Sequence, residues 1–234
     1  MAATALQRET EPKVLYPDSD GNPTAKNTIQ YQHIVAIQVG LDAMFANNPD
    51  VFVAADLLWY PVEGRPDIKN TLDLMVAYGR PKSDRGSYKQ WEEHDVAPQV
   101  VFKIASPVAT AAEMLSKRMF YDCYGVAEYY EYDPEIGMLD VWTRQSSPLR
   151  NAFFTDEWRS PLLGVTLKVE TNGELSVYRP NGERFLRPVE IRALANIAEA
   201  WAERERNRAE RERERAERLA AKLRELGIDP EQIN

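Results

Sequence analysis

Cysteine is nearly absent from this chain of 234 residues, and its scarcity excludes two classes of structure. Cys123 is the single cysteine, so the chain can hold neither a disulfide framework nor a cysteine-based zinc site. No stretch approaches 18 uncharged apolar residues, which argues against a membrane-spanning helix. The first dozen residues contain acids and lack an apolar core, so a secretory signal is not expected. Together these absences predict a cytoplasmic protein without a membrane partner.

The chain also lacks an excess of positive charge. The net charge is −8, which argues against a protein that holds nucleic acid over its whole surface. Between Ala202 and Glu225 there are nine Lys or Arg against seven Glu, a net of +2, so the rest of the chain carries −10. Any contact between this remainder and nucleic acid must therefore be local, through a basic loop or a bound cation.

The hydrophobic pattern predicts a mixed α/β domain over residues 26–188. Residues 1–25 are rich in Pro, Gly and polar side chains and are expected to form a loose arm. Apolar residues recur at helical spacing over 26–47 and 110–124, and β-branched or aromatic runs predict strands between and after these helices. The expected strands are 51–61, 71–78, 100–106, 126–134, 138–143, 162–170 and 174–180. This order is typical of a mixed sheet flanked by helices.

Residues 189–226 are predicted to form one long charged helix, followed by a tail at 227–234. An apolar residue recurs every seven positions, as in a coiled-coil seam, at Ala195, Ala202, Ala209, Ala216 and Leu223. Glu205 and Glu212 stand where the second apolar residue of the seam belongs. Two interpretations are open: a solitary solvated helix, or a loose self-association helix. In both we expect little packing beyond Trp201.

Charged residues inside two apolar strands mark the candidate site. Asp73 lies between Leu72 and Leu74, and Lys103 lies between Phe102 and Ile104. Buried strands seldom carry charges unless these are paired, bound to metal or at a strand end facing a cleft. The following helix carries Glu113 and Lys117 four residues apart, and thus on one face. Carboxylates that hold Mg²⁺ and a lysine that positions water form the inventory of a metal-dependent phosphodiesterase.

The loop over residues 79–91 leaves the strand of Asp73 and is strongly basic. It contains Arg80, Lys82, Arg85 and Lys89 against the single acid Asp84. With Tyr88 and Trp91 interleaved, these cations suit a DNA backbone and a splayed base. The alternative is a solvated loop whose two aromatic residues are tucked into the core, and the sequence favours neither.

Three blocks of the sequence resemble the Uma-two family, a branch of the PD-(D/E)XK nuclease superfamily. They are TLDLMVAYGRPKSDRGSYKQW, APQVVFKIASP and SKRMFYDCYGVAEYYEYDP. The opening PDSDGNP and the charged C-terminal helix are similar as well, so the resemblance covers most of the chain. It implies a restriction-endonuclease-like fold, with a central mixed sheet flanked by helices. It also implies DNA as substrate and Mg²⁺ or Mn²⁺ as cofactor. A homodimer formed through the nuclease domain or the C-terminal helix is a separate expectation.

The family's catalytic residues carry over only in part. Asp73 matches the first aspartate, although Leu72 replaces the proline before it, and Lys117 followed by Tyr121 matches the family's lysine. The family's glutamate is replaced by Lys103. A protonated lysine cannot bind Mg²⁺, since its ammonium has no free acceptor.

Two hypotheses follow from the replacement of the glutamate. In the first, the chain is an inactive nuclease fold that binds DNA or a partner protein. In the second, Glu113 has taken over the missing role as metal ligand beside Asp73, with Asp56 and Asp42 as further candidates.

Overall fold

The computed structural model describes residues 14–21, 27–107, 109–146 and 148–227. The chain divides into two units, one that ends at Arg187 and one that begins at Pro188. Residues 1–13 and 22–25 of the expected arm, and residues 228–234 of the expected tail, lie outside the described residues.

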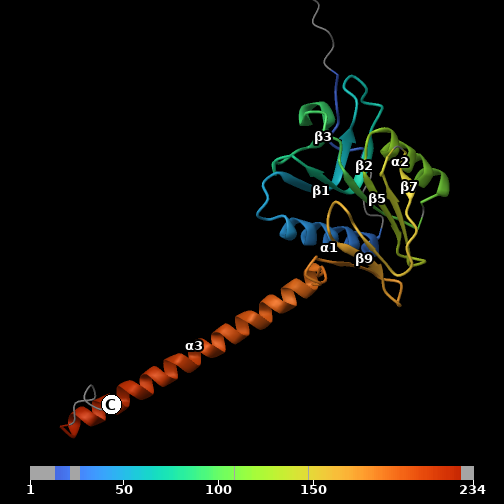
Figure 1. The fold of residues 1–234 in the computed structure, drawn as a ribbon. Coiled ribbons are helices and arrows are strands. Elements are labelled where there is room, and N and C mark those ends of the chain that lie inside the picture. The colour runs from blue at the N-terminus through green and yellow to red at the C-terminus, as the bar shows by residue number, and fades with distance from the viewer. Residues whose placement is uncertain (1–13, 22–26, 108, 147, 228–234) are drawn as a thin grey trace, which may run out of the picture. The chain divides into compact units, whose positions relative to one another are not determined.

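A seven-stranded mixed sheet forms the centre of the first unit (Figure 1). The strand order is β3-β1-β2-β4-β5-β6-β7; β3 runs parallel to β1 and β5 parallel to β4, while the other neighbours are antiparallel. The strands are β1 (Val51–Tyr60), β2 (Asn70–Tyr78), β3 (Ser87–Lys89), β4 (Val100–Ile104), β5 (Glu128–Asp133), β6 (Met138–Thr143) and β7 (Arg150–Asn151). The expected mixed α/β architecture is therefore confirmed.

Helices cover the two faces of this sheet because side chains alternate along each strand. Phe102 of β4 packs in one core with Ile34 and Leu41 of helix α1 (Thr28–Met44). Val101, on the other face, packs with Tyr121 of helix α2 (Ala111–Cys123). Lys103 shares the face of Val101 and thus points to the side of α2.

A smaller antiparallel sheet extends the core on the side of α1. Its strands are β8 (Glu157–Arg159), β9 (Thr166–Val169) and β10 (Leu175–Tyr178), in the order β10-β9-β8. Leu167 and Val177 join the same hydrophobic cluster as α1. The smaller sheet thus packs on the side of α1, whereas α2 packs on the face that carries Lys103.

The expectation of an irregular loop over residues 79–91 is wrong at its C-terminal end. Ser87–Lys89 forms β3, and the 3-10 helix η1 (Gln90–Glu93) follows directly. Tyr88 is fully buried and donates a hydrogen bond to the carbonyl of Val96 at 2.7 Å. A strand of three residues has too little sequence to show alternation, and only its parallel pairing with β1 reveals it.

The second unit contains helix α3 (Pro188–Glu225), which agrees with the expected bounds to within one residue. The structure describes all 38 residues of α3, and none of them is buried. Among the described residues, no helix is long and apolar enough to cross a membrane.

Candidate functional site

Asp73 and Lys103 form a buried ion pair between neighbouring strands. Lys103 Nζ lies 2.8 Å from both carboxylate oxygens of Asp73, and the two side chains are 11% and 3% exposed. The hydrogen-bond ladder between β2 and β4 reaches Leu74 and Phe102. Beyond it, Asp73 Oδ2 accepts a hydrogen bond from the backbone N–H of Ile104 at 2.9 Å. The expected proximity of Asp73 and Lys103 is therefore confirmed.

The pair belongs to a row of charges that crosses the sheet. Lys103 on β4 lies opposite Glu131 on β5, and Glu131 lies opposite Asp140 on β6. The ammonium of Lys103 is thus flanked by the acids Asp73 and Glu131 on the two neighbouring strands. Burial raises the pKa of Glu131, and Asp140 adds to that rise, while the hydrogen bond from Tyr129 at 2.9 Å opposes it.

Helix α2 brings Lys117 to this row, as expected. Burial lowers the pKa of Lys117, and the nearby ammonium of Lys103 lowers it further, against the opposing fields of Asp73, Asp20 and Glu113. Tyr121, one turn later, is fully buried, and burial raises the pKa of its hydroxyl well above the usual value. Asp73, Lys103 and Lys117 therefore lie within one electrostatic environment.

Glu113, the expected substitute ligand, has a structural task at the start of α2. Its Oε2 accepts hydrogen bonds from the backbone N–H of Thr110 at 2.8 Å and from the Thr110 hydroxyl at 3.1 Å. The Thr110 hydroxyl in turn accepts from the backbone N–H of Glu113, which completes a capping box. A Glu three residues after a Thr is the sequence signal for this motif. The prediction of Glu113 as a metal ligand did not take that signal into account.

The two other substitute acids have different surroundings. Asp56 interrupts β1 with a positive φ of 54°, and burial, Asp20 and Asp73 together raise its pKa. Asp56 is thus a neighbour of Asp73. Asp42 lies on α1, which packs against the opposite face of the sheet, and Lys82 is the charge that acts on it. Asp42 is therefore not a candidate ligand beside Asp73.

The described part of the expected loose arm is bound to the sheet, which corrects that expectation for residues 14–21. The Tyr60 hydroxyl donates to the carbonyl of Pro17 at 2.6 Å, and the Ser87 hydroxyl donates to Asp18 at 3.0 Å. The Thr71 hydroxyl donates to Asp20 at 2.8 Å. These contacts bring Asp20 close enough to act on the pKa values of Asp56 and Lys117. Sequence reasoning missed Asp18 and Asp20 because nothing local shows that the arm returns to the sheet.

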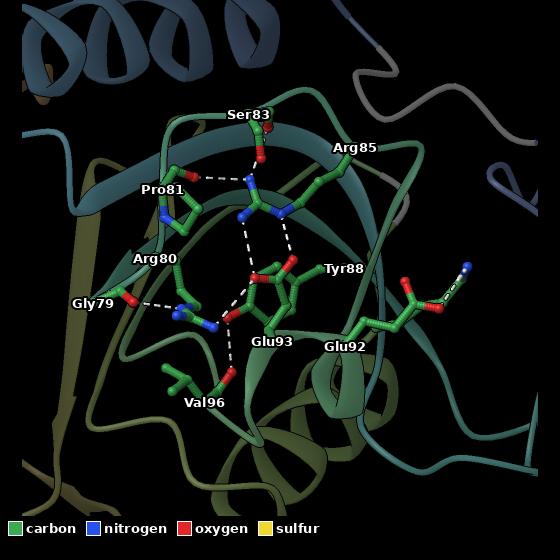
Figure 2. Close-up of polar contacts among 10 residues, drawn as sticks. Gly79, Arg80, Pro81, Ser83, Arg85, Tyr88, Glu92, Glu93 and Val96 are labelled. Carbon is green, nitrogen blue, oxygen red and sulfur yellow. Dashed lines mark hydrogen bonds and ion pairs between the residues drawn. The ribbon is translucent and has the colours of Figure 1, made fainter.

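The two arginines of the basic loop are directed inward, toward Glu93 (Figure 2). Arg85 Nε and Nη2 both donate to the Glu93 carboxylate, at 2.5 and 3.1 Å, and the Arg85 guanidinium lies 3.9 Å from the centre of the Phe52 ring. Arg80 Nη1 lies 3.8 Å from the same carboxylate. The side chains of Arg80 and Arg85 are only 12% and 8% exposed. Both expected DNA contacts are thus occupied within the protein.

The two lysines of this loop also have internal partners, but they lie nearer the surface. Lys82 Nζ donates to the carbonyl of Phe45 at 2.6 Å, and Lys89 Nζ donates to Glu92 at 3.3 Å. Glu92 and Glu93 come directly after Trp91. The excess of positive charge expected for residues 79–91 therefore depended on ending the count at Trp91. The cations of the loop are thus paired mainly with the two acids that follow it, and Lys82 is bound to a backbone carbonyl.

Of the cavities, one lies at the end of the charged row. It has a volume of about 440 Å³, and its lining includes Ser106, Arg118, Glu131 and Asp140. A larger hollow of about 970 Å³ lies over β6 and β9 and shares only Met138 and Asp140 with the first. The chemistry of the charged row therefore concerns the smaller cavity.

The residues at Asp73 do not fit a divalent metal. Mg²⁺ needs several oxygen donors in near-octahedral geometry, whereas both oxygens of Asp73 already bind an ammonium. Among the described residues, no three His, Cys, Asp or Glu side chains are grouped so that they could hold a metal ion. The charge that a cation would supply to Asp73 comes from Lys103.

No protein-family model matches this chain, and no curated protein is significantly similar to it. Among solved structures, the chain is similar to the crystal structure of a candidate nuclease of DUF820 from Anabaena variabilis. The two chains are 11% identical, and the match covers 57% of this chain and 73% of the other with a TM-score of 0.41. At this identity and TM-score the likeness carries no function to the chain.

Proposed function

We propose that this chain is a nuclease-fold protein, related to the Uma-two family, in which the ammonium of Lys103 replaces the divalent cation and removes cleavage. The observation that supports the proposal best is the contact of Lys103 Nζ with both oxygens of Asp73 at 2.8 Å. The resemblance places the family's glutamate at this position. The pair therefore stands where two carboxylates would hold a metal.

Acidic side chains lie on both sides of Lys103. Asp73 and Glu131 flank it on two neighbouring strands, so two acids face one ammonium. A divalent cation would have to displace the ammonium from Asp73, and breaking a buried ion pair costs several kcal/mol. Phosphodiester cleavage with Mg²⁺ or Mn²⁺ is therefore not expected from this site.

The competing function is residual endonuclease activity with Glu113 as a migrated metal ligand. In its favour, Glu113 and Lys117 lie four residues apart on one face of α2. Against this function, Glu113 Oε2 already accepts two hydrogen bonds at the start of α2. We therefore favour a non-cleaving protein that binds DNA or a partner protein.

Cleavage of supercoiled plasmid with Mg²⁺ or Mn²⁺ tests the proposal. The parent protein is expected to cut at background level, and Lys103→Glu is expected to restore a second carboxylate and raise both Mn²⁺ affinity and cleavage. Lys103→Gln is the matched control, because it removes the ammonium without adding a carboxylate. Adding Asp73→Ala to Lys103→Glu should abolish the gain.

Two outcomes distinguish the alternatives. Cleavage by the parent that Glu113→Ala abolishes would establish the migrated site. Cleavage by the parent that survives both Glu113→Ala and Asp73→Ala would place the chemistry in other residues and refute both functions.

DNA binding without cleavage is tested separately, by fluorescence anisotropy with a labelled duplex at several salt concentrations. Lys82 and Lys89 lie nearest the surface among the four loop cations, so Lys82→Glu and Lys89→Glu should weaken any binding and flatten its salt dependence. Arg80→Gln should act chiefly on stability, since Arg80 is directed toward Glu93. Equal anisotropy for parent and both lysine variants would refute a contact through this loop.

A further inference from the structure

Helix α3 leaves a long seam of side chains uncovered. Large apolar residues lie at both of its ends, with Trp201 66% and Leu219 53% exposed. Between these ends the helix carries alternating Glu and Arg, and three i,i+4 ion pairs lie along it, between side chains that are 60% exposed or more. Exposed pairs of this kind contribute little to stability. The charged side chains are therefore free to exchange these partners for others on a neighbouring molecule at little cost.

The seven-residue repeat defines which residues share the seam. Its first row holds Ala195, Ala202, Ala209, Ala216 and Leu223, and its second row, four residues before each of these, holds Ile191, Ala198, Glu205, Glu212 and Leu219. Arginines border the middle of the seam on both sides, at Arg206, Arg208, Arg213 and Arg215. The seam is thus apolar at its ends and acidic between basic borders at its centre.

A parallel pairing of two such helices in register would place like charges together. Each Glu205 would face Glu205 of the second copy, and each Glu212 would face Glu212 of the second copy. In a parallel pair, a residue that flanks the seam meets the residue five positions later in the other helix. Arg208 would therefore face Arg213 of the second copy. Like charges in these positions oppose association.

An antiparallel pairing centred on Asn207 separates the glutamates of the seam. Ile191 then lies opposite Leu223, and Ala195 lies opposite Leu219, so large side chains meet at each end. Glu205 lies opposite Ala209, and Glu212 lies opposite Ala202, so each glutamate faces a small residue and can reach the arginines on the border. This register overlaps all of the helix except Pro188, about 55 Å at 1.5 Å per residue.

The borders of the antiparallel pair are complementary away from its centre. Glu199 falls beside Arg213 of the second copy, and Trp201 falls beside Arg215, where the guanidinium can lie over the indole ring. Both contacts occur twice by symmetry. Arg206 and Arg208 approach their own copies near the centre, and there Glu205 of both chains lies between the like charges and offsets them.

We infer that α3 is an interaction surface for a second copy of this chain, and that the two helices pair antiparallel with Ala195 of each opposite Leu219 of the other. This inference is independent of the proposed function, because it uses no residue of the charged row.

Disulfide cross-linking of the full-length chain tests the orientation. Two variants, Ala195→Cys and Leu219→Cys, are made with Cys123→Ser, because Cys123 is exposed, and are coexpressed with tags of different size. Antiparallel pairing predicts a cross-link between the two variants and none when either variant is expressed alone. Cross-links of each variant to itself would establish parallel pairing and overturn the inference.

Sedimentation equilibrium tests the association itself. The parent is expected to be a dimer at micromolar concentration, and Leu219→Glu should weaken dimerisation at least about tenfold, because it places a carboxylate in an apolar layer. Ala221→Glu is the matched control: it adds the same charge two residues away, outside the seam, and should leave dimerisation unchanged. A monomeric parent, or equal loss in both variants, would overturn the inference.

Discussion

Replacing Lys103 by methionine tests whether the buried ion pair compensates the charge of Asp73. Methionine keeps an unbranched side chain of similar length and removes only the ammonium. Asp73 is 3% exposed, and it would keep a single hydrogen bond, from the backbone N–H of Ile104. Breaking a buried pair by removing one partner costs about 3–5 kcal/mol.

The expected loss is large enough to measure directly. For a unit of this size it corresponds to a fall in Tm of roughly 6–20 °C. Urea unfolding followed by tryptophan fluorescence gives the free energy of unfolding for each variant. Adding Asp73→Asn to Lys103→Met should recover most of the loss, because asparagine has no charge and can still accept the hydrogen bond from Ile104.

Lys89→Met serves as the control for the loss of a lysine charge. Lys89 pairs with Glu92 at 3.3 Å, and the two side chains are 26% and 60% exposed. Exposed pairs contribute about 0–1 kcal/mol, so this variant should be close to the parent. A loss below about 1 kcal/mol for Lys103→Met, or a double variant whose loss is the sum of its single changes, would show that Lys103 does not compensate Asp73.

Three further predictions concern other parts of the first unit. The pKa of Glu131 is raised in the folded protein, so its ionisation opposes folding once the pH rises above the unfolded value near 4.5. Glu131→Gln should therefore raise Tm at pH 7, and calorimetry should show that this gain shrinks toward pH 4.5. Glu93→Gln leaves the guanidinium of Arg85 without a buried counter-charge and should lower the free energy of unfolding by about 3 kcal/mol in urea; an unchanged midpoint would contradict the internal role of this loop. Gly86→Ala would place a Cβ against the carboxylate of Asp18, so hydrogen exchange should show faster labelling of residues 14–21, and unchanged protection would mean that the arm is held elsewhere.

The sequence placed Asp73 and Lys103 in buried strands, and the family resemblance predicted that they lie together. Each lies between apolar neighbours in a β-branched run, and such a run predicts a buried strand in which a charge needs a partner. Helical spacing likewise predicted that Lys117 and Glu113 share one face of α2. The bounds of α3 and its seven-residue repeat follow from the sequence too, because local periodicity determines them without any long-range contact.

The row that contains the pair needed the tertiary structure. Alternation shows which residues share a face of one strand, but it does not show which residue of the next strand lies opposite. Glu131 and Asp140 join Lys103 only through the registers of β4 with β5 and of β5 with β6. Asp56 also shifts the alternation within β1, since Val53 packs toward α1 whereas Leu57 packs toward α2.

The roles of the arm and of the basic loop were likewise decided by contacts between distant segments. Pro17, Asp18 and Asp20 meet partners more than 40 residues away in the sequence. Arg85 was expected at the surface because basic loops are usually solvated, yet Glu93 and Phe52 hold its guanidinium inside. Composition and periodicity report the local preferences of a chain. Whether a charge meets DNA, solvent or an internal acid depends on which distant segments pack beside it, and only the folded structure determines that.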